Sequence, residues 1–197
     1  LGRADIRPYL SGGVYVALLH HPVRDREGRK TTAALTGLDV SDVCRSCATY
    51  GIDRLLVVTP LKSQREMLGV LVRHWTEGYG GTHNPDRAEA FRLVKWVPGL
   101  ERAVEWIRDR EKKDPCIVGT SASPHAGAVP GLEVKRMVLE GDAPLLFVFG
   151  TAHGLHDDAV RQCTMMMSPI AGGRGGYNHL AVRSAVAVVL DRFFGWR

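Results

Sequence analysis

The stretch PLLFVFGTAHGL (144–155) joins a continuous apolar run to a glycine-containing turn. An apolar run of this length, rich in aromatic and branched side chains, predicts a strand that is buried on both faces of a sheet. Gly150 at the end of the run lets the backbone turn sharply or come close to a ligand. The stretch therefore predicts a strand followed by a turn that suits either a plain connection to a helix or a bound nucleotide-like group.

A second stretch near the end of the chain has a similar form. CTMMMSPI (163–170) predicts a short extended segment, and a loop rich in glycine follows it. Asparagine is favoured at helix N-caps, so we expect Asn178 to cap a closing helix over 178–194. The apolar residues of that helix include Leu180, Val189 and Phe193.

The remaining segments alternate between the two kinds of secondary structure. Apolar runs predict strands over 14–19, 54–60, 91–99 and 116–122. Helical spacing predicts helices over 41–50, 61–78, 100–113 and 132–141, the first capped by Asp39 or Ser41. This alternation predicts an α/β fold with a mostly parallel sheet covered by helices on both faces. Ligands of such sheets bind beyond the carboxyl ends of the strands.

The bulk properties fit one folded domain. The chain has 197 residues, 45% of them hydrophobic, and a net charge of +5 that modestly favours an anionic partner. We expect residues 1–12 to be a poorly ordered lead-in, and Leu1 in place of Met fits a piece of a longer fusion chain or a trimmed tag. The sequence contains no signal pattern and no apolar run of the roughly 18 residues that span a membrane, which predicts a cytoplasmic protein without membrane contact.

Other motifs narrow the function classes. Cys44 and Cys47 form a CxxC pair inside a predicted helix with no second pair to complete a zinc site, so we expect small buried side chains and no metal. GxGxxG and GxxxxGK[ST] are both missing, which disfavours a dinucleotide site or a P-loop. A phosphate-binding hydrolase or regulatory domain is therefore the weakest alternative.

The two C-terminal stretches together resemble the cofactor loops of the SPOUT RNA methyltransferases. The resemblance implies a C-terminal trefoil knot and an S-adenosylmethionine site in which main-chain groups of the strand-end loops hold the cofactor. The cofactor-binding residues that it implies are Thr120, Ser121, Ala122, Gly150, Thr151, Gly154, Pro169, Ile170, Asn178, His179 and Leu180.

Most of the chain after residue 12 is also similar to one branch of this superfamily, found alone or fused behind a tRNA (guanine-N1)-methyltransferase. The similarity includes 20–23, 38–45, 49–51, 59–64, 74–75 and 84–87. It implies methylation of RNA, with tRNA as the expected substrate, by a homodimer whose interface includes the closing helix. The alternative is a cofactor- or RNA-binding appendage without catalysis.

Several polar residues are candidates for catalysis and RNA binding. Asp42 and Arg45 lie one helical turn apart and form either a surface ion pair or, through Arg45, a contact with RNA. His20 follows a strand, where a general base can sit. The residues expected to act in catalysis are Asp42, Arg45 and His20, with His21 and His179 as further possible proton acceptors. Those expected to contact RNA are Arg45, Asn84, Arg87 and Arg174.

One departure from the family pattern bears on the target atom. Ribose-methylating members carry an Asn and a second Ser at positions that match His179 and Ala181 in this chain. The departure favours methylation of a base over methylation of a ribose 2′-hydroxyl.

Overall fold

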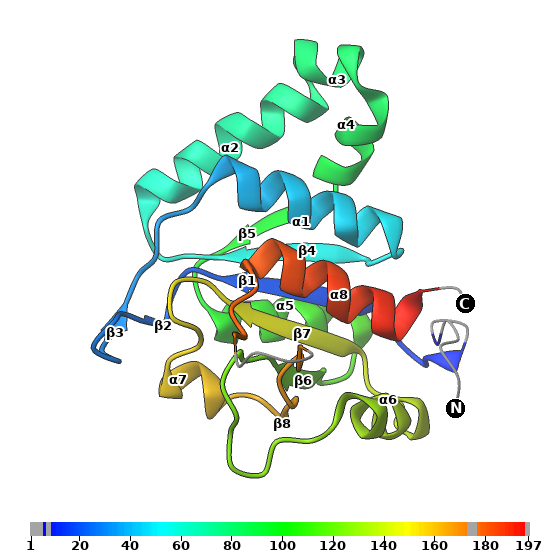
Figure 1. The fold of residues 1–197 in the computed structure, drawn as a ribbon. Coiled ribbons are helices and arrows are strands. Elements are labelled where there is room, and N and C mark those ends of the chain that lie inside the picture. Colours follow the sequence, from blue (N-terminus) through cyan, green and yellow to red (C-terminus); the bar gives the residue numbers. More distant parts are fainter. Residues whose placement is uncertain (1–5, 7–8, 173–176, 196–197) are drawn as a thin grey trace.

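The computed structural model describes residue 6, residues 9–172 and residues 177–195. Six parallel strands form one twisted sheet in the order β5-β4-β1-β7-β6-β8 (Figure 1). The strands are β1 (Val14–Leu19), β4 (Arg54–Val58), β5 (Val94–Val97), β6 (Cys116–Gly119), β7 (Leu145–Gly150) and β8 (Met165–Met166). The predicted parallel sheet is confirmed.

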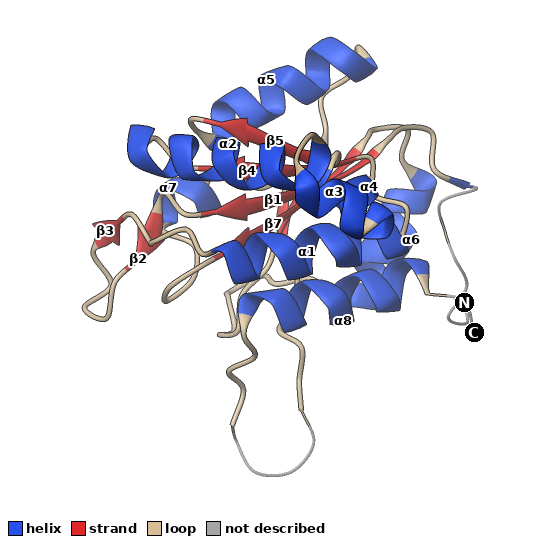
Figure 2. Cartoon of the chain, turned by 90° about the horizontal axis from the view of Figure 1, so that it is seen from above, coloured by secondary structure: helices blue, strands red, loops and turns tan. Residues whose placement is uncertain are grey.

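Helices cover both faces of the sheet (Figure 2). One face packs against α1 (Gly37–Thr49), α2 (Lys62–Thr76), α4 (Pro85–Phe91), α6 (Gly131–Glu140) and α8 (Val182–Phe194). The other packs against α5 (Leu100–Glu111) and α7 (Asp157–Val160). A short helix, α3 (Tyr79–His83), connects α2 to α4. The predicted α/β architecture with helices on both faces is therefore confirmed, whereas the trefoil knot stays a prediction.

The central strand β1 shows why the buried strands have continuous apolar sequences. Every residue of β1 is buried, and successive side chains point to opposite faces. Val16 and Leu18 belong to the core under α1 and α8, while Tyr15 and Leu19 belong to the core under α5. Both faces need apolar side chains, so the period-two pattern of a half-exposed strand disappears.

A short antiparallel pair was not expected. Segment 24–31 is highly charged and contains Gly28, a composition that predicts a loop, but β2 (Val23–Arg24) and β3 (Lys30–Thr31) pair at its two ends. Ion pairs from Arg24 to Asp157 and from Lys30 to Asp158 attach this hairpin to α7. Tertiary contacts of this kind leave no local signal in the sequence.

The first helix begins earlier than its spacing predicts. Its N-cap is Thr36 rather than Asp39 or Ser41, because the Thr36 hydroxyl accepts the Asp39 N–H at 3.1 Å. Asp39 lies in the first helical turn, where a negative charge interacts favourably with the helix dipole. The expected cap was therefore wrong by one turn.

We expect Thr36→Ala to lower the free energy of unfolding by about 1 kcal/mol, since it removes this cap. Urea denaturation monitored by circular dichroism measures the change. Thr49→Ala at the other end of α1 is the matched control, because the Thr49 hydroxyl only donates to the Arg45 carbonyl one turn back. Equal losses in the two variants would contradict the capping role of Thr36.

Two further boundaries differ from the prediction. The closing helix begins at Val182 with Ala181 as its N-cap, so the prediction that Asn178 caps it is wrong. The Asn178 side chain instead donates to the Ala122 carbonyl at 3.0 Å, a long-range contact that sequence cannot show. The strand predicted over 91–99 is confined to β5, because Phe91 ends helix α4, which Asn84 caps and Pro85 starts.

Candidate functional site

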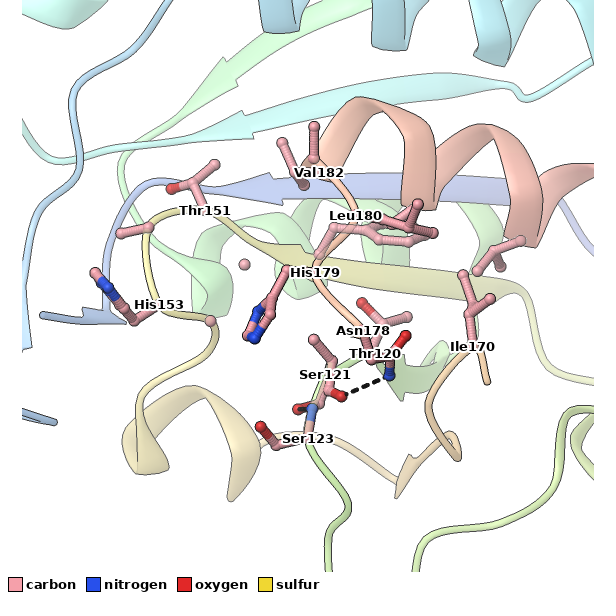
Figure 3. A pocket seen from close by; sticks show the side chains of 18 of the residues that line it. Thr120, Ser121, Ser123, Thr151, His153, Ile170, Asn178, His179, Leu180 and Val182 are labelled. Atoms are coloured by element: carbon pink, nitrogen blue, oxygen red, sulfur yellow. Dashed lines mark hydrogen bonds between the residues drawn. The ribbon is translucent and has the colours of Figure 1, made fainter. Parts of the chain in front are cut away.

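A cavity of about 740 Å³ opens at the carboxyl ends of β6 and β7 (Figure 3). Its walls come from the loop after β6, the turn after β7 and the segment leading into α8. The strand order reverses between β1 and β7, beside this cavity, since the chain passes from β1 outward to β4 and β5 and then returns to the other side of β1. Ligands of open α/β sheets bind at such a switch point, and the volume suits a cofactor-sized ligand.

The residues that the family resemblance assigns to the cofactor lie together around this cavity, with Pro169 as the exception. Pro169 lines a neighbouring hollow of about 500 Å³, which shares Met167, Ser168 and Val189 with the main cavity. Sequence reasoning missed other lining residues that have no ligand-binding signal of their own. They are Ala33, Ala34, Asp39, Ser123, Phe149, Met167, Ser168, Ala181, Val182, Ala185 and Val189.

The turn after β7 forms a backbone wall without space for a side chain at Gly150. A Cβ on Gly150 would lie 2.6 Å from the Leu155 nitrogen and 2.8 Å from the Gly154 carbonyl carbon. The turn is fixed because the Thr151 N–H and hydroxyl both donate to the Leu19 carbonyl, at 3.0 and 2.8 Å. Gly154 has a φ of 93°, which favours glycine. This wall lets a ligand contact main-chain groups directly.

The loop after β6 is fixed in the same way. The Thr120 N–H and hydroxyl both donate to the Val148 carbonyl, at 3.0 and 2.9 Å. The Asn178 amide then joins this loop to the segment before α8 through its bond to Ala122 (Figure 3). The two sides of the cavity are therefore connected by the Asn178 side chain, which donates to a main-chain carbonyl of the loop after β6.

The carboxylate of Asp42 has a different partner from the one expected. In the described part of the chain no ion pair links Asp42 to Arg45; Arg183 of α8 lies 3.5 Å from Asp42 and 3.3 Å from Asp39. Of the two alternatives for Arg45, the surface ion pair with Asp42 is therefore not formed among the described residues. Arg45 is exposed on α1, which leaves its guanidinium accessible from solvent.

His20 is fully buried and does not line the cavity. Neither ring nitrogen has a hydrogen-bond partner among the described residues. Burial lowers the pKa of His20, because the charged ring loses its hydration. The geometry thus gives no support to a direct role as general base. Of the other candidate histidines, His179 lines the cavity, while His21 bonds to the Thr32 hydroxyl at 2.9 Å.

Acidification from pH 7.5 to 5.5 is expected to lower the free energy of unfolding through His20. Its folded-state pKa is below the unfolded value of 6.5, so the unfolded chain binds the proton first as the pH falls. This contribution to stability is complete above pH 6.5 and is lost below it, by at most about 1.4 kcal/mol per pH unit.

Urea denaturation at the two pH values measures this loss, which should be smaller in His20→Leu. The exposed His83, changed to Gln, is the control and should keep the acid sensitivity of the natural chain. Equal acid sensitivity in His20→Leu and the natural chain would show that other groups are responsible.

The candidate RNA contacts Asn84 and Arg87 have structural partners. The Asn84 side chain accepts the Arg87 N–H at 3.0 Å and so caps α4. The Arg87 guanidinium lies 4.5 Å above the Trp75 ring centre, a cation–π distance. Arg174 lies outside the described residues. Arg45 is therefore the best-exposed of the described candidates for RNA contact.

Cys44 and Cys47 are buried in α1 with free thiols, as expected for small core side chains. Burial raises the pKa of Cys44 to about 12, so its thiol stays protonated. Among the residues that the structure describes, no group of three or more His, Cys, Asp or Glu side chains could hold a metal ion. None of the described helices is both long and apolar enough to cross a membrane.

The fold is that of the SPOUT methyltransferases. The TrmH/SpoU tRNA modifying enzyme from Aquifex aeolicus superposes with a TM-score of 0.54 at 14% identity, covering 92% of this chain and 73% of that one. The AdoMet-bound rRNA methyltransferase from Sinorhizobium meliloti has a TM-score of 0.53 at 16% identity, covering 97% of this chain and 60% of that one. These similarities show a common fold.

Sequence comparison identifies the family. A family model described as SAM-dependent RNA methyltransferase matches residues 13–195, and the chain belongs to this family. Proteins called tRNA (guanine-N(1)-)-methyltransferase are 43% identical in Nitratidesulfovibrio vulgaris and 41% identical in Oleidesulfovibrio alaskensis, each over 92% of this chain. The chain spans only 42% of the length of these two relatives.

The cavity fits the cofactor of this family, S-adenosylmethionine. Its volume is adequate, and the turn at Gly150 is packed so closely that its backbone, without a side chain, forms the wall. Small residues and main-chain groups make up most of the wall, which suits a ligand with both an adenosine and an amino-acid part. The residues that would hold it are those of the turns after β6 and β7 and of the segment before α8.

Proposed function

We propose that this domain methylates a base of tRNA, acts as a homodimer and works in the cytoplasm. The observation that carries the proposal is the cavity at the ends of β6 and β7, with its backbone walls at Thr120–Ala122 and Gly150–Gly154. The names of the two curated relatives support tRNA as the substrate. His179 and Ala181, both of which line the cavity, support base methylation because ribose-methylating family members carry other residues there.

In this proposal the protein residues align the methyl group with the target base. When bound, S-adenosylmethionine would supply a methyl group already activated by its sulfonium, with a neutral thioether as the by-product. The fixed turns after β6 and β7 orient the bound group, and such alignment is the main requirement for an in-line transfer. In this proposal Arg45, which is exposed on α1, pairs with a phosphate of the RNA. His179 is the described cavity residue best suited to accept a proton from the target base.

The apolar residues of the closing helix differ in whether a second subunit could contact them. Val189 and Phe193 are buried in the core of the chain itself, with 1% and 2% of their surface exposed. Leu180 before α8 and Leu38 on α1 are exposed apolar residues, at 48% and 57%. These two side chains therefore remain available to an interface along α1 and α8, and sedimentation of the purified domain tests the dimer.

A second function has support from the length of the relatives. The chain corresponds to less than half of proteins called tRNA (guanine-N(1)-)-methyltransferase, and the remainder of those proteins could carry their named activity. A domain of this kind could hold cofactor or tRNA for a fused enzyme without catalysis of its own. Turnover of the isolated domain distinguishes the two functions.

Isothermal titration of the purified domain with S-adenosylmethionine is the first test, with ATP and NAD as controls. We expect saturable binding of S-adenosylmethionine alone, followed by transfer of labelled methyl groups to unmodified tRNA transcripts. Binding without transfer to any RNA would favour the appendage. A folded domain that does not bind the cofactor would overturn the proposed catalytic function.

A further inference from the structure

Three charged side chains meet where α1 and α8 adjoin the cavity, and we call them the charge cluster: Asp39, Asp42 and Arg183. The Arg183 guanidinium lies 3.3 Å from the Asp39 carboxylate and 3.5 Å from the Asp42 carboxylate. The other Asp39 oxygen accepts the Thr36 hydroxyl at 2.6 Å. The Asp39 side chain is only 16% exposed and lines the cavity.

Without the two carboxylates of this cluster, Arg183 would be in an electrostatically unfavourable position. It occupies the first turn of α8, where a cation is repelled by the helix dipole, and that turn contains no acidic residue. The two carboxylates of α1 compensate for this repulsion. Two carboxylates share one guanidinium, so the cluster carries a net charge of −1. Arg45, one turn further along α1, is exposed and is therefore screened by solvent.

The rest of the described cavity wall carries no Lys, Arg or Glu side chain. Asp39 is its one carboxylate, and the histidines His153 and His179 are exposed. A fixed negative charge beside a partly enclosed cavity favours a cationic ligand over a neutral ligand of the same shape. The cofactor and its product form such a pair, since one carries a sulfonium and the other a thioether.

We propose that the charge cluster, through Asp39, makes the cavity discriminate the cationic cofactor from its neutral product, S-adenosylhomocysteine. This inference rests on the proposed function of the cavity. The loss of the positive charge on methyl transfer removes this attraction, and so the cluster favours exchange of product for fresh cofactor. Partial charges from the helix N-termini persist in any side-chain variant, so a change in discrimination reports the cluster alone.

The test measures the Kd of S-adenosylmethionine and of S-adenosylhomocysteine by isothermal titration in matched variants. In Asp39→Asn, the ratio of the product Kd to the cofactor Kd should fall roughly tenfold, the effect of removing one nearby charge from a site of intermediate dielectric. In Arg183→Gln the ratio should rise, because two carboxylates are left without their cation. Asp109→Asn makes the same chemical change on the exposed side of α5 and should leave the ratio unchanged.

The opposite directions expected for Asp39→Asn and Arg183→Gln separate electrostatic discrimination from simple damage to the cavity. Ratios within twofold of the natural value in both variants, with both ligands still bound, would overturn the inference. If Asp39→Asn does not fold, Asp42→Asn removes a charge outside the cavity lining and should lower the ratio by a smaller factor. Failure of the natural chain to bind either ligand would instead overturn the proposed function.

Discussion

Gly150→Ala is expected to lower the affinity for S-adenosylmethionine at least tenfold and the free energy of unfolding by about 2 kcal/mol, within the range for overpacked sites. The added Cβ would meet the Leu155 nitrogen at 2.6 Å and the Gly154 carbonyl carbon at 2.8 Å. Both are backbone atoms, so a rotamer change cannot relieve the clash. The turn would have to move, and it forms a wall of the cavity.

The turn resists such a movement because its hydrogen bonds connect it to β1. Thr151 donates twice to the Leu19 carbonyl, and the Gly154 N–H donates to the Thr151 carbonyl at 3.0 Å. Titration with the cofactor and urea denaturation measure the two effects. Gly37→Ala is the control, since a Cβ there would meet only a Leu71 methyl group at 3.8 Å. Normal cofactor affinity in Gly150→Ala would show that the turn does not contact the ligand.

The sequence predicts the central sheet well for a physical reason. Strands buried on both faces need apolar side chains at every position, which makes β1, β4 and β7 recognisable as continuous runs. The hairpin of β2 and β3 contacts residues far away in the chain, through backbone hydrogen bonds of Arg24 with His153 and Gly154 and through ion pairs with α7. Local pattern cannot contain that information.

The candidate site was predictable where glycine and small residues mark a backbone wall, as in the turns after β6 and β7. The contribution of α1 to the site was not predictable. In the sequence, Asp39 resembles an ordinary residue of a helix start, and only the fold brings it beside the cavity. Asn178 illustrates the opposite error. Its residue type favours a helix cap, but the tertiary bond to Ala122 determines its place instead.

Arg45→Ala is expected to reduce kcat/KM for tRNA methylation about 100-fold, the cost typical of a misplaced substrate, while the Kd of the cofactor stays within twofold. Arg45 is exposed on α1 and does not line the cavity, so its removal should leave the cofactor walls intact. Its guanidinium can bind a phosphate through two parallel hydrogen bonds, a geometry that Lys cannot reproduce. Arg45→Lys should therefore restore only part of the activity.

Arg73→Ala is the matched control for this experiment, because Arg73 is also an exposed arginine but lies near the end of α2. Methyl transfer to tRNA transcripts and cofactor titration, carried out on each variant, separate substrate alignment from cofactor binding. A parallel loss of both in Arg45→Ala would indicate a structural role for the side chain. Unchanged methylation would mean that Arg45 is an ordinary solvated residue, and RNA would then have to be held by a surface other than the exposed side of α1.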